Sequence, residues 1–176
     1  MEQCLAMVRG PTDEHRFVGL MMLPKVLEGS DSTADGGAKH RRAAFDALDL
    51  QFVGRLLISK GTDNAAQMRG VAFAVLSAFA GEPRFSVAAI ALAKCLGTAL
   101  TAVAEAATEY PDLTIAEDVH GTLRGVALSS EASVALAEAG GTGAAFKLLI
   151  ALDGAATEDA ASDLHSSRTA TAPQSL

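Results

Sequence analysis

The feature that most constrains the fold is a run of apolar residues at helical spacing near the middle of the chain. It consists of Met68, Val71, Ala72, Val75, Leu76, Phe79 and Ala80. These positions follow the i, i+3, i+4, i+7 rule of an α-helix with a buried stripe. Phe73 and Ala78 make the other side apolar too, so we expect a helix that is covered on two faces. Gly81 and Pro83 predict its end.

The chain before this helix shows the same pattern in shorter pieces. Residues 4–8 indicate a first helix that ends at a Gly-Pro pair, after which Thr12 is a suitable N-cap for a second helix. Pro24 is expected to kink or shorten that second helix, because proline lacks a backbone N–H. Residues 29–37 read as a polar loop. Helices then resume around residues 44–57, with a break near Asp49.

The chain after Pro83 is rich in alanine and leucine, which favours one or two helices up to Ala107 with a weak point near Gly97. Tyr110 and Pro111 predict the end of this segment. Further helix starts are predicted at a Thr114-x-x-Glu117 capping box, at Ser130 and at Thr142. Either Gly140 or Gly141 is expected to end the helix before the last one, which contains Phe146, Leu149, Ile150 and Leu152.

No stretch of convincing length alternates between apolar and polar residues, so the sequence predicts an all-α fold. Helices of two to four turns separated by short breaks favour stacked helical hairpins, as in a degenerate armadillo- or HEAT-like α-solenoid. A compact helical bundle is the rival architecture. We expect the helical segment to occupy residues 1–152 and residues 153–176 to form a disordered tail of low complexity.

The charge balance argues against nucleic acid as a partner. The chain has 14 basic and 21 acidic residues and a net charge of −7, which repels a polyphosphate. The basic run at residues 39–42 is the exception; we interpret it as a solvated helix face, although peripheral contact with anionic lipid or an acidic partner stays open. The start of the chain lacks the pattern of an export signal, and Cys4 and Cys95 are far apart, so we expect a cytoplasmic protein.

Residues 85–104 carry a single charge, at Lys94, and therefore raise the question of a membrane span. Gly97 and several hydroxyl residues make the stretch only weakly hydrophobic. We therefore predict a buried helix pair and no membrane span.

The sequence contains no motif that indicates catalysis, a cofactor or a metal. The four histidines, His15, His40, His120 and His165, and the two cysteines form no set with metal-ligand spacing. Asp118-x-His120 comes nearest, but its members point to different sides of a helix. The region around Gly141 matches no phosphate-binding fingerprint, and no nucleophile elbow is present. Five carboxylates that include no convincing acid–base pair cluster near one helix connection: Glu105, Glu109, Asp112, Glu117 and Asp118.

Three ordered segments carry a family resemblance: MEQCLAMVRGPTDEHRFVGLMMLPK at residues 1–25, DALDLQFVGRLLIS at 46–59 and RGVAFAVLSAFAGEP at 69–83. They resemble the N-terminal part of the neurochondrin family, also called norbin, and the similarity is expected to fade after about Phe85. The resemblance implies an armadillo-type, cytosolic, non-enzymatic protein that acts through protein contacts. For animal members it implies roles in neurite outgrowth, synaptic plasticity, receptor-tail binding and restraint of calmodulin-dependent kinase II phosphorylation.

The sequence departs from the family pattern in ways that shape the expectation. Family members are several times longer, Pro24 stands where a helix-compatible residue is expected, and residues 153–176 do not continue the repeats. We therefore expect the first part of a solenoid from a truncated or misassembled product, with an exposed apolar end that favours self-association. The functional hypothesis is a protein-interaction scaffold without catalytic, cofactor or metal residues. The alternative is a small helical enzyme or ligand-binding domain whose pocket is not visible in the sequence.

Overall fold

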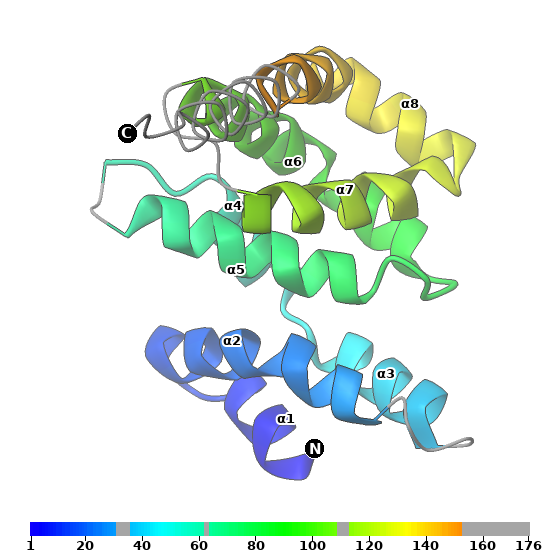
Figure 1. Cartoon of the computed structure of the whole chain (residues 1–176). Helices are drawn as coiled ribbons and strands as arrows, with labels where there is room; N and C mark the ends of the chain where they lie inside the picture. Colours follow the sequence, from blue (N-terminus) through cyan, green and yellow to red (C-terminus); the bar gives the residue numbers. More distant parts are fainter. Residues whose placement is uncertain (31–35, 62–63, 109–112, 153–176) are drawn as a thin grey trace, which may run out of the picture.

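The computed structural model describes residues 1–30, 36–61, 64–108 and 113–152, and within these ranges the chain is helical without a strand (Figure 1). The prediction of an all-α fold is therefore confirmed. The helices are α1 (Glu2–Val8), α2 (Asp13–Ser30), α3 (Gly36–Ala47), α4 (Leu50–Leu57), α5 (Ala65–Ala78), α6 (Phe85–Ala107), α7 (Leu113–Ala127), α8 (Ser130–Glu138) and a further helix at Gly141–Leu152. The predicted tail at 153–176 lies outside the described residues.

The helices form hairpins that pack side by side in two rows. Within the hairpins α1 packs on α2, α4 on α5 and α6 on α7. Between the hairpins α5 lies between α2 and α7, and α6 lies between α4 and α8. Figure 1 shows α2, α5 and α7 following one another along one side of the molecule.

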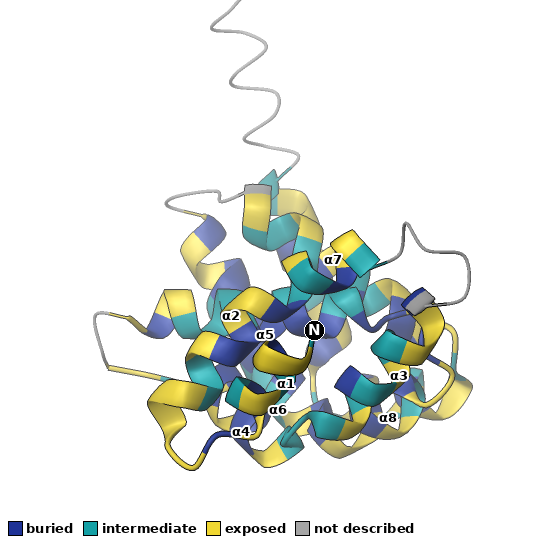
Figure 2. Ribbon diagram, turned by 90° about the horizontal axis from the view of Figure 1, so that it is seen from below, coloured by how far each residue is buried: buried dark blue, intermediate teal, exposed yellow. Residues whose placement is uncertain are grey.

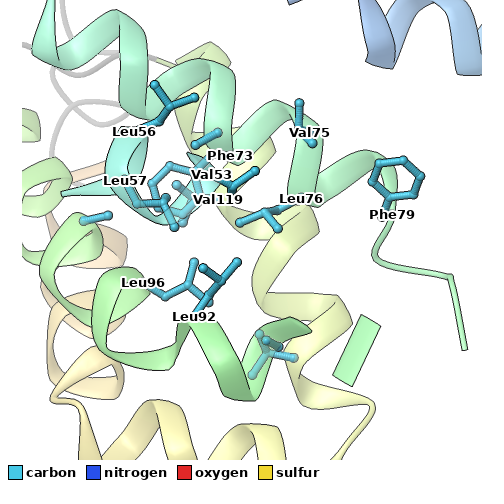
Figure 3. Close-up of a cluster of buried hydrophobic side chains, with 14 of the residues drawn as sticks. Val53, Leu56, Leu57, Phe73, Val75, Leu76, Phe79, Leu92, Leu96 and Val119 are labelled. Carbon is cyan, nitrogen blue, oxygen red and sulfur yellow. The ribbon is translucent and has the colours of Figure 1, made fainter. Parts of the chain in front are cut away.

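The core lies between the two rows, where side chains from four helices meet. Figure 3 shows Leu57 of α4, Phe73 and Leu76 of α5, Leu96 of α6 and Val119 of α7 in this cluster, and all are buried. Figure 2 shows the burial of each residue on the ribbon, with buried positions of the helices facing inward and exposed positions facing outward. The helix expected over residues 68–80 is confirmed as α5, and the burial of Phe73 opposite the main stripe shows that it is covered on two faces.

The structure corrects the expectation for Pro24. The helix begins as predicted, because Thr12 Oγ1 accepts a hydrogen bond from the backbone N–H of His15 at 3.3 Å. It then passes through Pro24 and continues to Ser30, so the predicted shortening is wrong. Leu23 and Leu27 are fully buried on either side of the proline. Burial of such side chains contributes about 1.5–3 kcal/mol each, which offsets the hydrogen bond that proline cannot make.

The loop expected at residues 29–37 is shorter than predicted. Gly29 and Ser30 belong to the last turn of α2, and α3 already begins at Gly36. Only residues 31–35 of the predicted loop lie outside the described helices, and their structure is not described. The polar composition of this stretch therefore marked the connection but not its ends.

The segment after Pro83 is one helix and not two. α6 runs without interruption from Phe85 to Ala107, past the weak point expected at Gly97. A Cβ atom at Gly97 would lie 3.1 Å from the carbonyl carbon of Ala139 and closer still to the carbonyl oxygen. Glycine therefore stands at this position because the end of α8 packs directly against the α6 backbone, and the alanine-rich neighbours keep the helix intact.

Three predicted helix starts are displaced by a residue or more. The side chain of Ser129, and not of Ser130, accepts the hydrogen bond that caps α8. α7 begins at Leu113 and the last described helix at Gly141, so Thr114 and Thr142 lie inside first turns and are not N-caps. Gly140 has a φ of 78°, which confirms the predicted left-handed end of the preceding helix. Several polar residues near each start make the capping residue ambiguous in sequence.

Candidate functional site

An open groove of about 590 Å³ lies where α2, α5 and α7 follow one another, and we call it the α2–α5–α7 groove. Its lining is mainly apolar, with Met21 from α2, Val71 from α5, Val103 from α6 and Ile115 from α7. Leu148, from the helix after α8, also lines the groove. Five helices, from α2 near the start of the chain to the helix after α8, therefore contribute to one concave surface.

The groove owes its depth to small side chains on α5. Gly70 and Ala74 are four residues apart, so they lie on the same face of the helix and both line the groove. A Cβ atom at Gly70 would meet no atom within 4 Å, which shows that open space lies above this position. Met21 is 48% exposed, so a flexible apolar side chain borders this space and is available for contact.

Asp118 is the acidic group of the groove, and it is half-buried. Burial raises the pKa of its carboxyl group above the ordinary value, and the nearby carboxylates of Glu117 and Glu28 raise it further. Among the ion pairs in the described ranges, none involves Asp118. Among the described residues, the groove thus holds a partly desolvated carboxylate that forms no ion pair.

The basic residue of the groove, Arg69, is directed elsewhere. Its Nη1 donates a hydrogen bond to the Ser59 carbonyl oxygen at 2.7 Å. This contact ties α5 to the end of α4, and Arg69 is not among the groups that shift the pKa of Asp118. Its Nε is buried and makes no hydrogen bond. Arg69 therefore contributes to the wall of the groove without neutralising Asp118.

The five carboxylates singled out in the sequence separate in the structure. Glu105 and Glu117 are exposed, Asp118 is half-buried, and Glu109 and Asp112 lie outside the described residues. The residue that sequence reasoning missed is Glu28, which α2 brings near Asp118. No spacing rule joins two carboxylates that far apart in the chain, so no signal in the sequence pointed to their proximity.

The histidines and cysteines do not converge. Within the part of the chain that the structure describes, no three His, Cys, Asp or Glu side chains are arranged to hold a metal ion. His15 contacts Thr12 at 2.8 Å, His120 is exposed, and His165 lies outside the described ranges. Cys4 is buried, and burial raises the pKa of its thiol. That the chain takes no metal or cofactor stays a prediction.

The basic run at residues 39–42 has two residues that pack into the fold and two that are exposed on the surface. The Arg41 guanidinium donates a hydrogen bond to the Ala78 carbonyl oxygen at the end of α5. His40 Nδ1 is buried and has no hydrogen-bond partner. Lys39 and Arg42 are exposed, so the surface cluster is smaller than the sequence indicates.

α6 has the length and composition of a membrane-spanning helix. Its most apolar 18-residue stretch has a mean hydropathy of 1.9, but 56% of that stretch is buried inside the fold. The core helix of a soluble protein has the same properties, and α6 packs against α4, α7 and α8. The pair α8 and Gly141–Leu152 also has them when taken together, but it is bent by 85°. The expected helix pair at residues 85–104 is thus a single central helix.

Helices that pack as hairpins, with an open apolar groove lined by several of them, define the class: an all-α protein. The chain belongs to the neurochondrin family, whose family model matches residues 1–160. The resemblance seen in the N-terminal segments is therefore confirmed, and the expectation that it fades after Phe85 is wrong. Neither the curated proteins nor the solved structures contain a match to this chain.

Proposed function

We propose that this protein is a non-enzymatic interaction scaffold, built as an armadillo-type α-solenoid, that binds segments of other proteins in the α2–α5–α7 groove. The observation that carries the proposal is the groove itself, an open apolar surface built by successive hairpins. Solenoids form binding surfaces in this way, because equivalent helices of successive repeats line one continuous face. Membership of the neurochondrin family supports the same reading.

The character of the groove favours a polypeptide over a small substrate. Catalysis needs a base or nucleophile with a group that orients it. Among the described residues that line the groove, Asp118 is the one carboxylate, and no histidine, cysteine or serine lines it with Asp118 to share these roles. Apolar anchor points beside one charge are instead typical of protein interfaces.

We extend the proposal to the setting in which the scaffold works. The net charge of −7 disfavours nucleic acid, and we propose that α6 is a core helix of a cytoplasmic protein and not a membrane span. Peripheral contact with anionic lipid would use the exposed Lys39 and Arg42. The family resemblance supports a role in neurite outgrowth and in modulating receptor and kinase signalling through protein contacts.

Selection of peptides from a random displayed library against the full chain tests the proposal. Gly70→Leu places a side chain in the open space of the groove, so we expect it to abolish binding of the selected peptides. Gly143→Leu is the matched control, because Gly143 also has no atom within 4 Å of its Cβ position but lies outside the groove. Selected peptides that bind both variants as well as the parent chain would contradict the proposal.

A further inference from the structure

We propose that the α2–α5–α7 groove selects protein segments that carry a Lys or Arg next to a large apolar side chain, and that Asp118 and Glu28 pair with that basic residue. This inference rests on the proposed function, since it names the chemistry of the partner that the groove accepts. It adds a charge requirement that an apolar groove alone does not impose.

The apolar part of the recognition follows from the lining. Pockets of about 300–1,000 Å³ bury a drug-sized group, so a groove of about 590 Å³ has room for a few side chains of a partner. Val71 and Ile115 face this space from α5 and α7, and the exposed Met21 borders it from α2. A large aliphatic or aromatic side chain would bury these surfaces.

The acidic part follows from the positions of the carboxylates on their helices. On α2, Glu28 is seven residues after Met21, so both lie on the same face, roughly 10 Å apart along the axis. On α7, Asp118 is three residues after Ile115, again on the same face and one turn further along. Each helix therefore presents an apolar residue and then a carboxylate, and Glu28 is close enough to Asp118 to affect its ionisation.

Within the described ranges, no cation pairs with this negative charge. Asp118 is partly removed from water, its charged neighbours are the carboxylates of Glu117 and Glu28, and Arg69 is engaged with Ser59. A cation from a partner would relieve the repulsion and regain the interaction that burial removed. Asp118 lines the same groove as Ile115 and lies one turn from it on α7, so an Arg or Lys next to a residue that contacts Ile115 would be placed beside this carboxylate.

Charge complementarity also separates this partner from other occupants. An acidic segment would add negative charge to three carboxylates and is disfavoured. A second copy of this chain carries a net charge of −7 and fits less well than a basic segment. The expected partner is therefore a locally basic, apolar-anchored stretch of another protein.

Three fluorescein-labelled peptides that share a Ser-Leu-X-Leu repeat, with Arg, Gln or Glu at X, test the inference by fluorescence anisotropy with the full chain. We expect the Arg peptide to bind most tightly. The double variant Asp118→Asn, Glu28→Gln should weaken its binding about tenfold, as expected for loss of a charge-assisted contact. The double variant Glu2→Gln, Glu138→Gln also removes two charges, from exposed positions outside the groove, and should change affinity less than about twofold, which controls for overall charge.

The outcomes separate this inference from the proposed function. Equal binding of all three peptides, with loss of all three in Gly70→Leu, would leave the groove as a docking site and overturn the charge requirement. An Arg preference that survives unchanged in the double variant would assign the preference to overall charge and also overturn it, as would a lack of binding by the Arg peptide. Thermal unfolding of the double variant checks that it is folded.

Discussion

Replacing Gly97 by alanine tests how α6 and α8 are held together. In an exposed helix interior, Gly→Ala stabilises a protein by about 0.5–1 kcal/mol, because alanine loses less backbone entropy on folding. At Gly97 the new methyl group would lie 3.1 Å from the carbonyl carbon and 3.2 Å from the Cβ of Ala139, and closer to the carbonyl oxygen. The obstacle is backbone at the end of α8, so a side-chain rotation cannot relieve it.

The two helices must therefore separate, and overpacking of this kind costs about 1–3 kcal/mol. This cost exceeds the gain in helix propensity, so we expect Gly97→Ala to lower the free energy of unfolding. Gly70→Ala is the matched control: it makes the same change in α5, where the Cβ position has no neighbour within 4 Å, and should raise stability by about 0.5–1 kcal/mol.

Urea unfolding followed by circular dichroism at 222 nm measures both free energies in the full chain. The expected result is a pair of shifts in opposite directions for the same chemical change. If Gly97→Ala stabilised the protein as much as Gly70→Ala does, the close approach of α8 to α6 would not constrain the fold, and the reasoning would be refuted.

Three further predictions concern the groove, a helix cap and the exposed apolar face of the last described helix. Asp118→Asn should stabilise the fold at neutral pH, because the raised folded-state pKa of Asp118 means that its charged form destabilises the folded chain relative to the unfolded one. The gain in stability should shrink as the pH falls through that folded-state pKa, because the aspartate of the parent chain then becomes neutral. Urea unfolding at several pH values checks this, and a loss of stability at neutral pH would contradict it. Asp49→Ala should lower the free energy of unfolding by about 1 kcal/mol, because Asp49 Oδ1 caps α4 by accepting hydrogen bonds from the backbone N–H groups of Gln51 and Phe52. Asp49→Asn keeps a capping oxygen and should lower it less in the same assay. Equal losses in the two variants would argue against capping. Self-association is expected through three apolar residues of the last described helix, Phe146, Leu149 and Ile150, which are 64%, 63% and 59% exposed. Phe146→Lys should reduce this self-association as measured by sedimentation velocity. A parent chain that stays monomeric at high concentration would rule the prediction out.

Local chemistry placed most of the helices correctly. The apolar stripe around Leu76 predicted α5, the Gly-Pro pair after α1 predicted its end, and Thr12 and Gly140 perform the capping roles that their residue types favour. These features depend on residues within one or two turns of each other. The order of helices and the family resemblance could therefore be recognised from the sequence.

Long-range packing decided what local rules predicted wrongly. The rules would shorten a helix at Pro24 and weaken one at Gly97. Burial of Leu23 and Leu27 carries α2 past the proline, and the close approach of Ala139 explains the glycine. Neither compensation is visible in the sequence, because each involves contacts made only when the helices pack.

The candidate site shows the same division. The sequence by itself determined that this chain is all-helical, that its carboxylates outnumber its cations, and that it belongs with the neurochondrin family, because periodicity, composition and ordered motifs are properties of the chain. Only the tertiary structure brought Met21, Gly70 and Ile115 around one groove and placed Glu28 within electrostatic reach of Asp118. Such proximity arises when hairpins stack, and the sequence separation between these residues carries no record of it.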